Sequence, residues 1–506
     1  MRIQASLKNS AVGLLMQSAT ILIGLVSQSI FIKYLGIEYA GVSSVLNNII
    51  SMLSIAELGI GTAIVFSLYE PLANNNKEKL KSLMHLYKTA YQTVGIIIAI
   101  VGIFLLPFLK FFFKDITIDI NLKFIYFLYL GDTVISYFFT YKRSLLYADQ
   151  KNYVNGIIDF LFLVLMNVLQ IVCIVTTRNY YYYVIIRVIV HLSEYLFIVA
   201  VVNRRYPFIK DKHIQALGKA EKTPIIVNIK ALFFHKIGRF LVLSTDNLIV
   251  SSMINVATAG IFNNYKLISK SLQNVAGIVI GATTASFGNL LVDQPERSYE
   301  VFRKIYYVNF IIAIVFTTCY ACAVQPFMKF FAGSKNLFSM NVVLIMSLEL
   351  YIHLMRNSIG VGRDAAGIYH NDRFVPLWES AVNLISSIAL VKVLGVSGVV
   401  LGTIISTLVS VFISVPYLTY KYIYHKPLYN YYLLYCRYFL IMVFSLGLSL
   451  FVTKNITIGN YFLHFVVNGS IGLGISFLSI LLFTSHSEEY RYVIKLLKTI
   501  KEKKHL

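Results

Sequence analysis

Apolar runs of about 20 residues or more follow one another along the chain from Asn9 to Phe483, and short polar connections separate them. Each run is long enough to cross the hydrocarbon core of a bilayer as an α-helix. The runs are continuous and do not alternate with period two, which disfavours transmembrane β-strands. The pattern predicts an all-α integral membrane protein with about fourteen spans. These are 10–33, 40–68, 88–112, 122–147, 153–176, 181–203, 226–253, 257–291, 302–328, 339–361, 373–394, 397–423, 431–453 and 459–484.

The longest polar connection, at 204–224, divides the spans into six before it and eight after it. A short internal similarity crosses this divide, because Lys33–Gly41 and Ser252–Gly260 share hydrophobic positions and an Ala-Gly ending. Two related six-helix halves, as in transporters with parallel repeats, or a chance similarity would both explain it. We expect five parts: an N-lobe (1–203), a cytoplasmic linker (204–225), a C-lobe (226–424), spans thirteen and fourteen (425–484) and a basic cytoplasmic tail (485–506).

The basic residues indicate the orientation of the chain. With the amino terminus inside, the cytoplasmic connections collect about 30 Lys and Arg and the outer loops about nine. An even number of spans then places both termini in the cytoplasm. Residues 77–90 and 490–500 carry apolar residues at helical spacing beside lysines, which is typical of amphipathic helices in the inner membrane interface.

The composition agrees with this class of protein, with 57% hydrophobic and 13% charged residues and a mean hydropathy of +0.70. A formal net charge of +22 would suggest nucleic-acid binding in a soluble protein, but here the excess of Lys and Arg faces cytoplasm and anionic lipid. We therefore expect no nucleic-acid partner. Cys319 and Cys322 have the spacing of a redox or zinc pair, but they lie within an apolar run and are interpreted as packing residues.

The seventh and eighth spans are the most polar and most basic. His235, Lys236, Arg239 and Asp246 fall on about one third of the circumference of the seventh. The eighth carries a stripe of similar polarity: Asn263, Lys266, Lys270 and Asn274. An amphipathic helix pair held by ion pairs would explain these residues. The cations outnumber the carboxylates, however, which favours a water-filled cationic cavity for an anionic ligand.

Three carboxylates within spans are candidate ion-coupling residues: Glu57, Asp132 and Asp246. A carboxylate in a bilayer can bind a proton or Na⁺, since burial disfavours its charged form. Pairing with a cation on another helix is the alternative for Glu57 and Asp132. Ionisable groups at helical spacing in the sixth and tenth spans permit ion pairs within one helix: Arg187, His191 and Glu194, and Glu349, His353, Arg356 and Arg363.

Sequence motifs for enzymatic chemistry are absent. The chain contains no Gly-x-x-x-x-Gly-Lys-Ser/Thr phosphate loop, no His-Glu-x-x-His and no Asp-rich metal motif. We predict no catalytic residues, no metal and no cofactor, and a transporter with H⁺ or Na⁺ as the candidate coupling ion.

Several stretches resemble bacterial polysaccharide flippases of the multidrug/oligosaccharidyl-lipid/polysaccharide exporter superfamily, and their order along the chain carries the resemblance. They are Phe31-Ile-Lys-Tyr-Leu-Gly-Ile-Glu-Tyr-Ala-Gly, Ala56-Glu-Leu-Gly-Ile-Gly-Thr-Ala, Ser67-Leu-Tyr-Glu-Pro-Leu-Ala, Tyr141-Lys-Arg-Ser-Leu-Leu-Tyr-Ala-Asp-Gln-Lys-Asn-Tyr, Ser244-Thr-Asp-Asn-Leu-Ile-Val-Ser and Ala285-Ser-Phe-Gly-Asn-Leu.

This resemblance implies a transporter that moves undecaprenyl-diphosphate-linked oligosaccharides across the bacterial cytoplasmic membrane, by alternating access, for O antigen, capsule or a related glycan. A diphosphate needs cations to replace its water, and the basic stripes supply them. Membrane lipids and polysaccharide polymerases or glycosyltransferases are the further partners it suggests. Two alternatives remain: an ion-coupled drug or metabolite antiporter of the same superfamily, and a membrane glycan polymerase or ligase.

Overall fold

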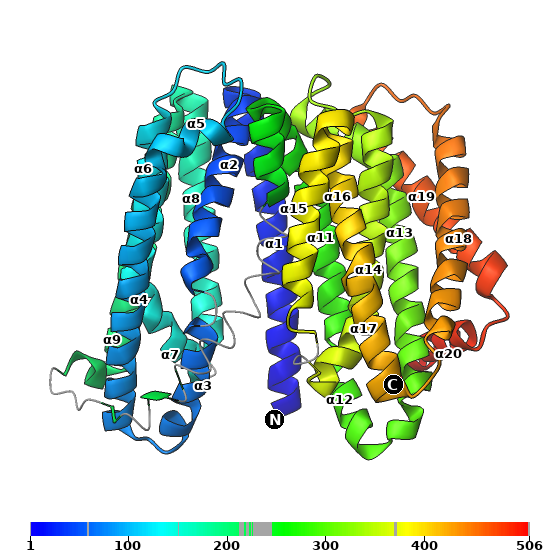
Figure 1. Cartoon of the computed structure of the whole chain (residues 1–506), viewed down its shortest axis with the longest axis horizontal. Coiled ribbons are helices and arrows are strands. Elements are labelled where there is room, and N and C mark those ends of the chain that lie inside the picture. The colour runs from blue at the N-terminus through cyan, green and yellow to red at the C-terminus, as the bar shows by residue number, and fades with distance from the viewer. Residues whose placement is uncertain are drawn as a thin grey trace. The chain divides into compact units, whose positions relative to one another are not determined.

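A computed structural model describes residues 2–57, 60–149, 151–211, 217–218, 222–223, 225, 245–368 and 372–503. Side chains are described for these residues except 2–18, 55–56, 60, 62–64, 210, 285 and 496–503. Every regular element in the described part is a helix (Figure 1), which confirms the all-α prediction. The contacts group the chain into two compact units, Met1–Gly260 and Ile261–Leu506. The predicted boundaries of the lobes, the linker and the tail stay a prediction.

The first unit contains long helices, several short helices and four 3₁₀ turns among its described residues. They are α1 (Arg2–Leu35), α2 (Ile37–Leu53), η1 (Ser54–Glu57), α3 (Ile60–Ala73), α4 (Lys77–Leu105), η2 (Leu106–Phe108), α5 (Leu109–Phe112), α6 (Leu122–Phe139), η3 (Thr140–Lys142), α7 (Arg143–Ala148), α8 (Asn152–Thr177), α9 (Tyr180–Arg205) and η4 (Pro207–Lys210).

Helix α4 packs against α6 through a close contact at Gly102. A Cβ atom there would come within 2.5 Å of Leu130, and the Tyr126 hydroxyl donates to the Gly102 carbonyl at 2.9 Å.

The amphipathic segment 77–90 is the first part of α4 and not a separate interfacial helix. That interpretation was wrong because its apolar face packs into the unit, where Leu83 and Tyr87 are buried.

The turns of the two similar segments, Lys33–Gly41 and Ser252–Gly260, meet in this unit. A Cβ on Gly41 would lie 2.1 Å from the carbonyl oxygen of Val256, and a Cβ on Gly260 would lie 2.5 Å from the carbonyl oxygen of Ile37. The contact is reciprocal, since each glycine faces the backbone four residues before the other. Only the absence of side chains lets the two backbones approach so closely.

The second unit is built from α11 onward. Its elements are α11 (Val256–Gly281, which begins within the first unit), α12 (Thr284–Asp293), η5 (Pro295–Arg297), α13 (Ser298–Ala332), α14 (Met340–Ala366), α15 (Val375–Leu394), α16 (Val396–Val409), α17 (Val411–Thr419), η6 (Tyr420–Tyr424, a π-helical turn), α18 (Tyr429–Thr453), α19 (Tyr461–Thr484) and α20 (Glu488–Lys503).

Helix α13 is the core of this unit and contacts α14, α18 and α19. Helices α15 and α16 form a tight antiparallel hairpin, which turns at Gly395 with a positive φ of 57°. A Cβ on Gly398 would lie 2.3 Å from the Leu390 carbonyl oxygen, and a Cβ on Gly402 would lie 2.2 Å from Ser387 Oγ. This Gly-x-x-x-Gly pair lets the two backbones touch.

Eleven helices of the described part are long and apolar enough to cross a membrane, and each coincides with a predicted span. Of the other three predicted spans, 10–33 falls in α1, whose described apolar part is Ala19–Leu35. Most of span 226–253 lies outside the described residues. Span 40–68 is not one helix: α2 ends at Leu53, the 3₁₀ turn η1 follows over Ser54–Glu57, and α3 begins at Ile60.

The order of helix contacts recurs in the two units. In the first, α4 contacts α6, α6 contacts α9 and α8 contacts α9; in the second, α13 contacts α14, α14 contacts α16 and α15 contacts α16. An internal repeat predicts this recurrence.

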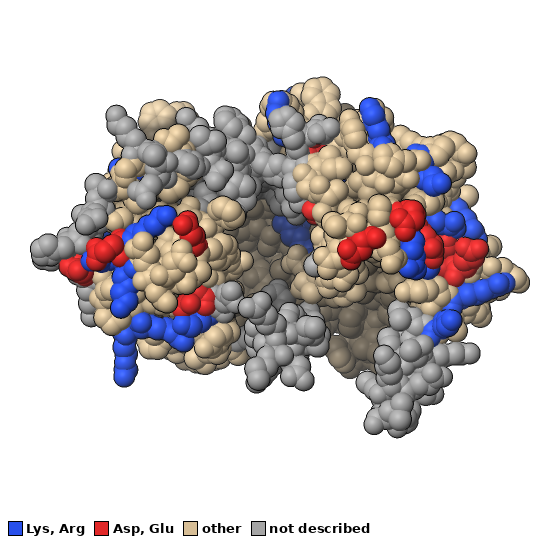
Figure 2. Space-filling model, turned by 90° about the horizontal axis from the view of Figure 1, so that it is seen from below, with Lys and Arg blue, Asp and Glu red and all other residues tan. Residues whose placement is uncertain are grey.

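In both units, charged side chains gather at the helix ends, as the face seen from below shows (Figure 2).

Candidate functional site

Helix α11 carries the polar stripe that the sequence predicts for the eighth span. Asn263, Lys266, Lys270 and Asn274 follow one another at intervals of three or four residues, so they share one helix face. Lys266 is buried, Asn263 is half-buried, and Lys270 and Asn274 are exposed. The stripe therefore runs from the interior of the second unit to its surface.

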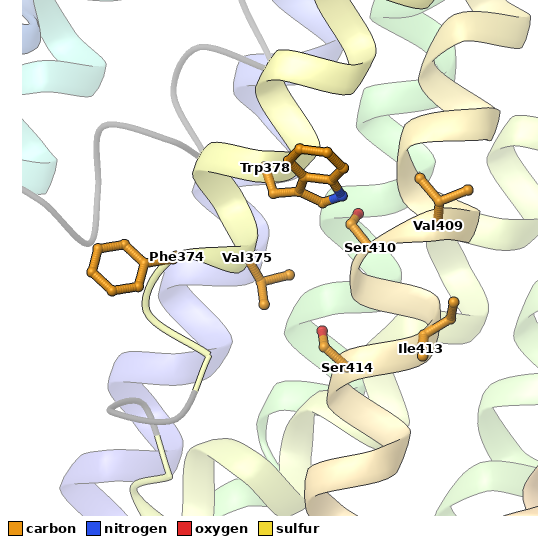
Figure 3. Close-up of a pocket in the computed structure, with 7 residues that line it drawn as sticks. All are labelled: Phe374, Val375, Trp378, Val409, Ser410, Ile413 and Ser414. Carbon is orange, nitrogen blue, oxygen red and sulfur yellow. The ribbon is translucent and has the colours of Figure 1, made fainter.

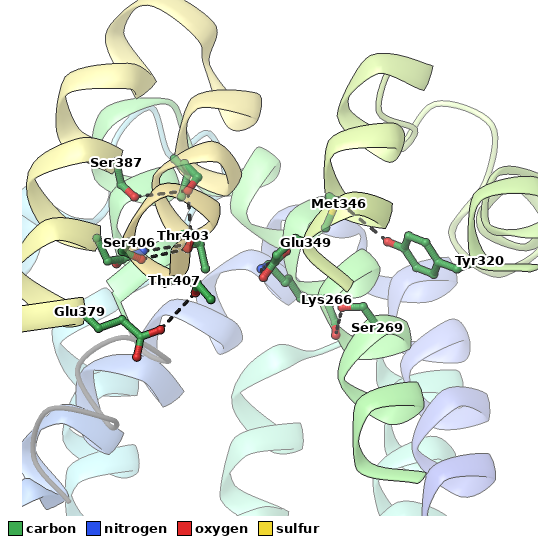
Figure 4. A network of polar contacts seen from close by, with 12 residues as sticks. Lys266, Ser269, Tyr320, Met346, Glu349, Glu379, Ser387, Thr403, Ser406 and Thr407 are labelled. Carbon is green, nitrogen blue, oxygen red and sulfur yellow. Dashed lines mark hydrogen bonds and ion pairs between the residues drawn. The ribbon is translucent and has the colours of Figure 1, made fainter. Parts of the chain in front are cut away.

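Lys266 is neutralised by a carboxylate on another helix. Its Nζ donates to both carboxylate oxygens of Glu349, on α14, at 2.6 and 2.7 Å. Only 11% of the Lys266 side chain and 14% of the Glu349 side chain are exposed, and the ammonium also lies 5.3 Å from the ring of Phe262. Figure 4 shows the two side chains pointing toward each other. The alternative that the sequence left open, helices held by ion pairs, therefore describes Lys266.

Lys270 lies one turn beyond Lys266 and is the fifteenth of the 26 residues of α11. Its side chain is exposed in the middle of a helix that is apolar enough to span a bilayer. An ammonium group facing hydrocarbon at that depth is costly, so this face of α11 requires polar or aqueous surroundings. Asn274 extends the exposed polar face by one further turn.

The remaining residues of the predicted cationic cavity, His235, Lys236 and Arg239, lie outside the described residues. Asp246 lies in the described part of the seventh span, helix 245–253, and is 8% exposed. The neighbouring Asn247 donates to Ser44 Oγ on α2 at 2.8 Å, which ties this helix into the first unit.

A second polar centre lies in the first unit around Asp132, which is 5% exposed on α6. Two residues of α9 bind its carboxylate: Arg187 Nε at 3.2 Å and His191 Nδ1 at 2.9 Å. Arg187 also donates to Asn47 Oδ1 on α2 at 3.0 Å, and its guanidinium lies 4.5 Å from the Tyr129 ring centroid. The alternative of a carboxylate paired across helices therefore describes Asp132.

The polar centre continues along α9. Glu194, one turn beyond His191, accepts from Arg143 on α7, and Arg143 also donates to Asp159 of α8 at 2.5 Å. These ion pairs join α9 to α6, α7 and α8. These pairs form between helices. The spacing of Arg187, His191 and Glu194 had also permitted ion pairs within one helix.

Glu57, the third candidate carboxylate, ends the 3₁₀ turn η1. Its Oε2 accepts a hydrogen bond from the Tyr137 hydroxyl of α6 at 2.8 Å. Glu57 is half-buried. It is therefore held by a neutral donor, whereas Asp132 is held by a guanidinium and an imidazole.

The sequence interpretation missed Glu379, which is 4% exposed on α15. It accepts from Arg356 Nη1 of α14 and from Thr407 Oγ1 of α16, each at 3.1 Å. Asn383, one turn further, donates to Thr403 at 3.0 Å. The signal for this polar site in the sequence was an acidic residue inside the apolar run 373–394, four positions before an amide.

A small cavity of about 20 Å³ lies between the pair of Lys266 with Glu349 and the cluster around Glu379, and Figure 4 shows both. It has room for about one water molecule. Its lining residues are Glu349, Ile352, His353, Thr403, Ile404 and Thr407. The two polar groups of the second unit therefore border one polar space.

Solved structures with this fold were found, whereas no protein-family model and no curated protein matches the chain. The lipid II flippase MurJ, in an inward closed conformation, is 15% identical with a TM-score of 0.71 over 95% of this chain and 99% of that one. A MATE multidrug transporter, solved with a bound ligand, is 17% identical with a TM-score of 0.58 over 81% of this chain and 95% of that one.

An inward-facing multidrug resistance MATE family transporter of the MOP superfamily is similar to the same degree, at 13% identity and a TM-score of 0.57 over 79% of this chain and 93% of that one. Identities this low establish the fold and not the substrate. The chain thus has an all-helical, multi-pass fold like that of MurJ and the MATE transporters.

Proposed function

We propose that the protein is a flippase that carries undecaprenyl-diphosphate-linked oligosaccharide repeat units across the bacterial cytoplasmic membrane. The transported repeat units would be used to synthesise a surface polysaccharide, such as O antigen, capsule or a related glycan. Alternating access through a cationic cavity is the mechanism that this proposal implies.

The exposed side chain of Lys270 in the middle of a spanning helix is the single observation that carries the proposal. A cation in the middle of a spanning helix, beside the amide of Asn274, suits a ligand with a negative headgroup and hydrogen-bonding groups. A diphosphate and a sugar have these properties. Lys266 is engaged by Glu349 and would contribute by fixing the position of the stripe. His235, Lys236 and Arg239 complete the proposed binding residues, with Asn263.

The extent of the structural similarity favours a lipid flippase over a drug antiporter. The match to MurJ includes 95% of this chain, whereas the matches to the two MATE transporters include 79% and 81%. MurJ is described as a lipid II flippase, and a lipid-linked substrate is the corresponding proposal for this chain.

Coupling to a proton is proposed at Asp132, with Na⁺ as the other candidate ion and with Glu57 and Asp246 as further candidates. Asp132 lies between a permanent cation, Arg187, and a titratable imidazole, His191. A proton that neutralises this carboxylate would remove its attraction for Arg187, which also binds Asn47 of α2. Protonation would therefore change the contacts that join α6, α9 and α2.

The proposal includes the bacterial cytoplasmic membrane as the location, with both termini cytoplasmic, because this orientation places most Lys and Arg inside. Membrane lipids and the polymerases or glycosyltransferases of the same glycan are the proposed partners.

The decisive experiment is deletion of the gene, followed by measurement of surface glycan and of lipid-linked oligosaccharide in each leaflet. We expect surface glycan to fall while intermediates accumulate in the inner leaflet. Complementation with Lys270→Ala should restore roughly tenfold less glycan than the wild type, since charged hydrogen bonds contribute about 1.5–3 kcal/mol. Lys270→Arg should restore it.

Lys454→Ala is the matched control, because Lys454 is an exposed lysine at the end of α18, outside the stripe. Equal glycan with Lys270→Ala and Lys454→Ala, at equal membrane expression, would remove Lys270 from the binding site. The antiporter alternative predicts a different phenotype of the deletion, with normal surface glycan and increased sensitivity to organic cations.

A further inference from the structure

The predicted span 397–423 is interrupted where α16 meets α17. Ser410, with φ −120° and ψ −91°, lies outside the helical range, and its hydroxyl donates to the Ser406 carbonyl. The amide of Ile413 donates to the Ser410 carbonyl at 3.2 Å, only three residues back, so α17 starts its own series of hydrogen bonds there. One residue therefore connects two separately bonded helices.

The α15–α16 hairpin, on one side of this connection, is a rigid body. Besides the close contacts at Gly398 and Gly402, hydrogen bonds of side chains join its two helices on successive turns. They link Glu379 with Thr407 at 3.1 Å, Asn383 with Thr403 at 3.0 Å, Ser386 with the Gly402 carbonyl at 3.2 Å, and Ser387 with the Val399 carbonyl at 3.3 Å. The two helices must therefore move together.

Helix α17 and η6, on the other side, are attached to α13 and α18. Pro416 lacks the amide that would bond the Phe412 carbonyl, and the Tyr432 hydroxyl of α18 donates to that carbonyl at 3.2 Å. Tyr424, at the end of η6, stacks on Phe302 of α13 with the ring centroids 4.7 Å apart. The junction of α16 and α17 is thus also the boundary between the hairpin and the body of the unit.

A groove of about 320 Å³ lies between the start of α15 and this junction (Figure 3). Its lining residues are Phe374, Val375, Trp378, Val409, Ser410, Ile413 and Ser414. Trp378 of α15 is 61% exposed and Ile413 of α17 is 51% exposed, so neither side chain covers the other. The Oγ of Ser414 is buried and has no hydrogen-bond partner among the described residues. Helices α15 and α17 therefore have room to approach each other.

The contact of the hairpin with α14 is polar and incompletely packed. Glu379 accepts from Arg356 of α14 at 3.1 Å, and the cavity with room for about one water molecule lies between α14 and α16. A displacement of the hairpin changes this contact. Helix α14 also carries Glu349, which binds Lys266 of the polar stripe, so such a displacement would reach the proposed substrate site.

We propose that Ser410 is a hinge of the transport cycle. The α15–α16 hairpin swings about Ser410 against α17, and the groove between Trp378 and Ile413 opens and closes with this movement. Hinges of moving bodies are commonly a few residues at the ends of helices, which absorb the change in φ and ψ. The movement itself does not depend on the substrate, whereas its use in transport rests on the proposed flippase function.

Trp378 is the only tryptophan of the chain, so it can serve as a quencher of a label placed across the groove. A bimane label is attached to Ile413→Cys in the full-length protein in lipid nanodiscs, with the exposed Cys436 replaced by serine, and Trp378→Phe gives the unquenched reference. We expect one quenched and one unquenched population of molecules. Ser410→Ala should change their ratio about twofold, because alanine favours a helical backbone over serine, and Ser410→Gly should keep both populations.

Val409→Cys is the matched labelling position. Val409 lines the same groove and is 47% exposed, but it lies on the hairpin side of Ser410. There we expect a single population that Ser410→Ala does not change. A single population at position 413 would overturn the proposal, because the bend would then be static. The same two populations at 409 and 413 would also overturn it, because the movement would then not occur at Ser410.

The role of the hinge in transport is tested in the deletion strain. Ser410→Ala, at equal membrane expression, should restore at most about half of the surface glycan, in line with its altered populations, and Ser410→Gly should restore it fully. Full restoration by Ser410→Ala would remove the hinge from the transport cycle. Normal glycan in the deletion strain itself would contradict the proposed function only, since the fluorescence of the labelled protein tests the hinge without any substrate.

Discussion

Lys266 of α11 and Glu349 of α14 form a buried ion pair, with Nζ 2.6 Å from one carboxylate oxygen and 2.7 Å from the other. The pair joins the polar stripe of α11 to the helix that carries His353 and Arg356. It divides the predicted cationic stripe into a structural part, at Lys266, and an exposed part, at Lys270 and Asn274.

Removal of one partner of this pair should destabilise the protein. Glu349→Gln leaves the Lys266 ammonium buried without its carboxylate, and the expected loss of unfolding free energy is about 3 kcal/mol. Thermal unfolding of the purified protein measures it. The double variant Lys266→Met/Glu349→Gln should recover most of the loss.

The exposed pair of Lys304 and Glu300 on α13 is the control for that experiment, since 57% of the Glu300 side chain is exposed. Glu300→Gln should cost less than about 1 kcal/mol. Equal losses of unfolding free energy for Glu349→Gln and Glu300→Gln would contradict this prediction, because the buried pair would then contribute no more to stability than the exposed pair.

Replacement of Asp132 tests the polar centre of the first unit. Asp132→Asn keeps the shape of the side chain but removes the negative charge between Arg187 and His191. We expect transport that no longer responds to a proton gradient, measured as flipping in vesicles with and without an imposed pH difference. Asp159→Asn, at the exposed end of the same line of charges, should leave the response intact. An unchanged response in Asp132→Asn would make the carboxylate structural.

The reciprocal contact of Gly41 and Gly260 predicts a steric effect. Gly41→Ala places a methyl group 2.1 Å from the Val256 carbonyl oxygen, so the helices must separate, at a cost of about 1–3 kcal/mol. Gly156→Ala is the control, because a Cβ at that position of α8 has no atom within 4 Å. It should be neutral or stabilising by up to about 1 kcal/mol. Thermal unfolding of both variants distinguishes them, and equal stability would contradict the close packing.

Asp149, between α7 and α8, predicts a dependence on pH. Burial opposes its ionisation, but the Lys151 ammonium at 2.5 Å and the Tyr206 hydroxyl outweigh this and lower the pKa of Asp149 below its ordinary value of 3.8. A lowered pKa stabilises the folded state above the ordinary value, and this contribution is lost as the pH falls through the lowered value. Asp149→Asn should therefore cost about 1 kcal/mol at pH 7, and the difference from wild type should shrink below about pH 4. Unfolding midpoints at several pH values test this, and a difference that is constant with pH would exclude the charge as its cause.

The sequence located the polar helix faces but not their partners. The spacing of Asn263, Lys266, Lys270 and Asn274 placed them on one stripe, and the structure has them there. That Lys266 is neutralised depends on Glu349, which lies 83 residues further along the chain. Similarly, no local pattern joins Asp132 of α6 to Arg187 and His191 of α9. Glu379 was overlooked because its partners, Arg356 and Thr407, lie on two other helices.

The hydropathy pattern also did not predict the breaks within spans. Residues 40–68 and 397–423 each form one long, mainly apolar run, so each pattern predicted a single helix, whereas the structure interrupts them after Leu53 and at Ser410. Hydropathy measures the transfer of side chains into lipid, and it is insensitive to which backbone hydrogen bonds are made.

The order of residues was enough to establish an all-helical membrane protein and the ends of most spans, because the thickness of the bilayer sets the length of an apolar run. It was also enough to establish which helix faces carry charge, because 100° per residue is a local property. Packing between helices then set which charges are neutralised, where glycines let helices touch and where a groove remains beside Trp378. Those outcomes depend on contacts between helices far apart in the chain, and a one-dimensional pattern contains no distance between them.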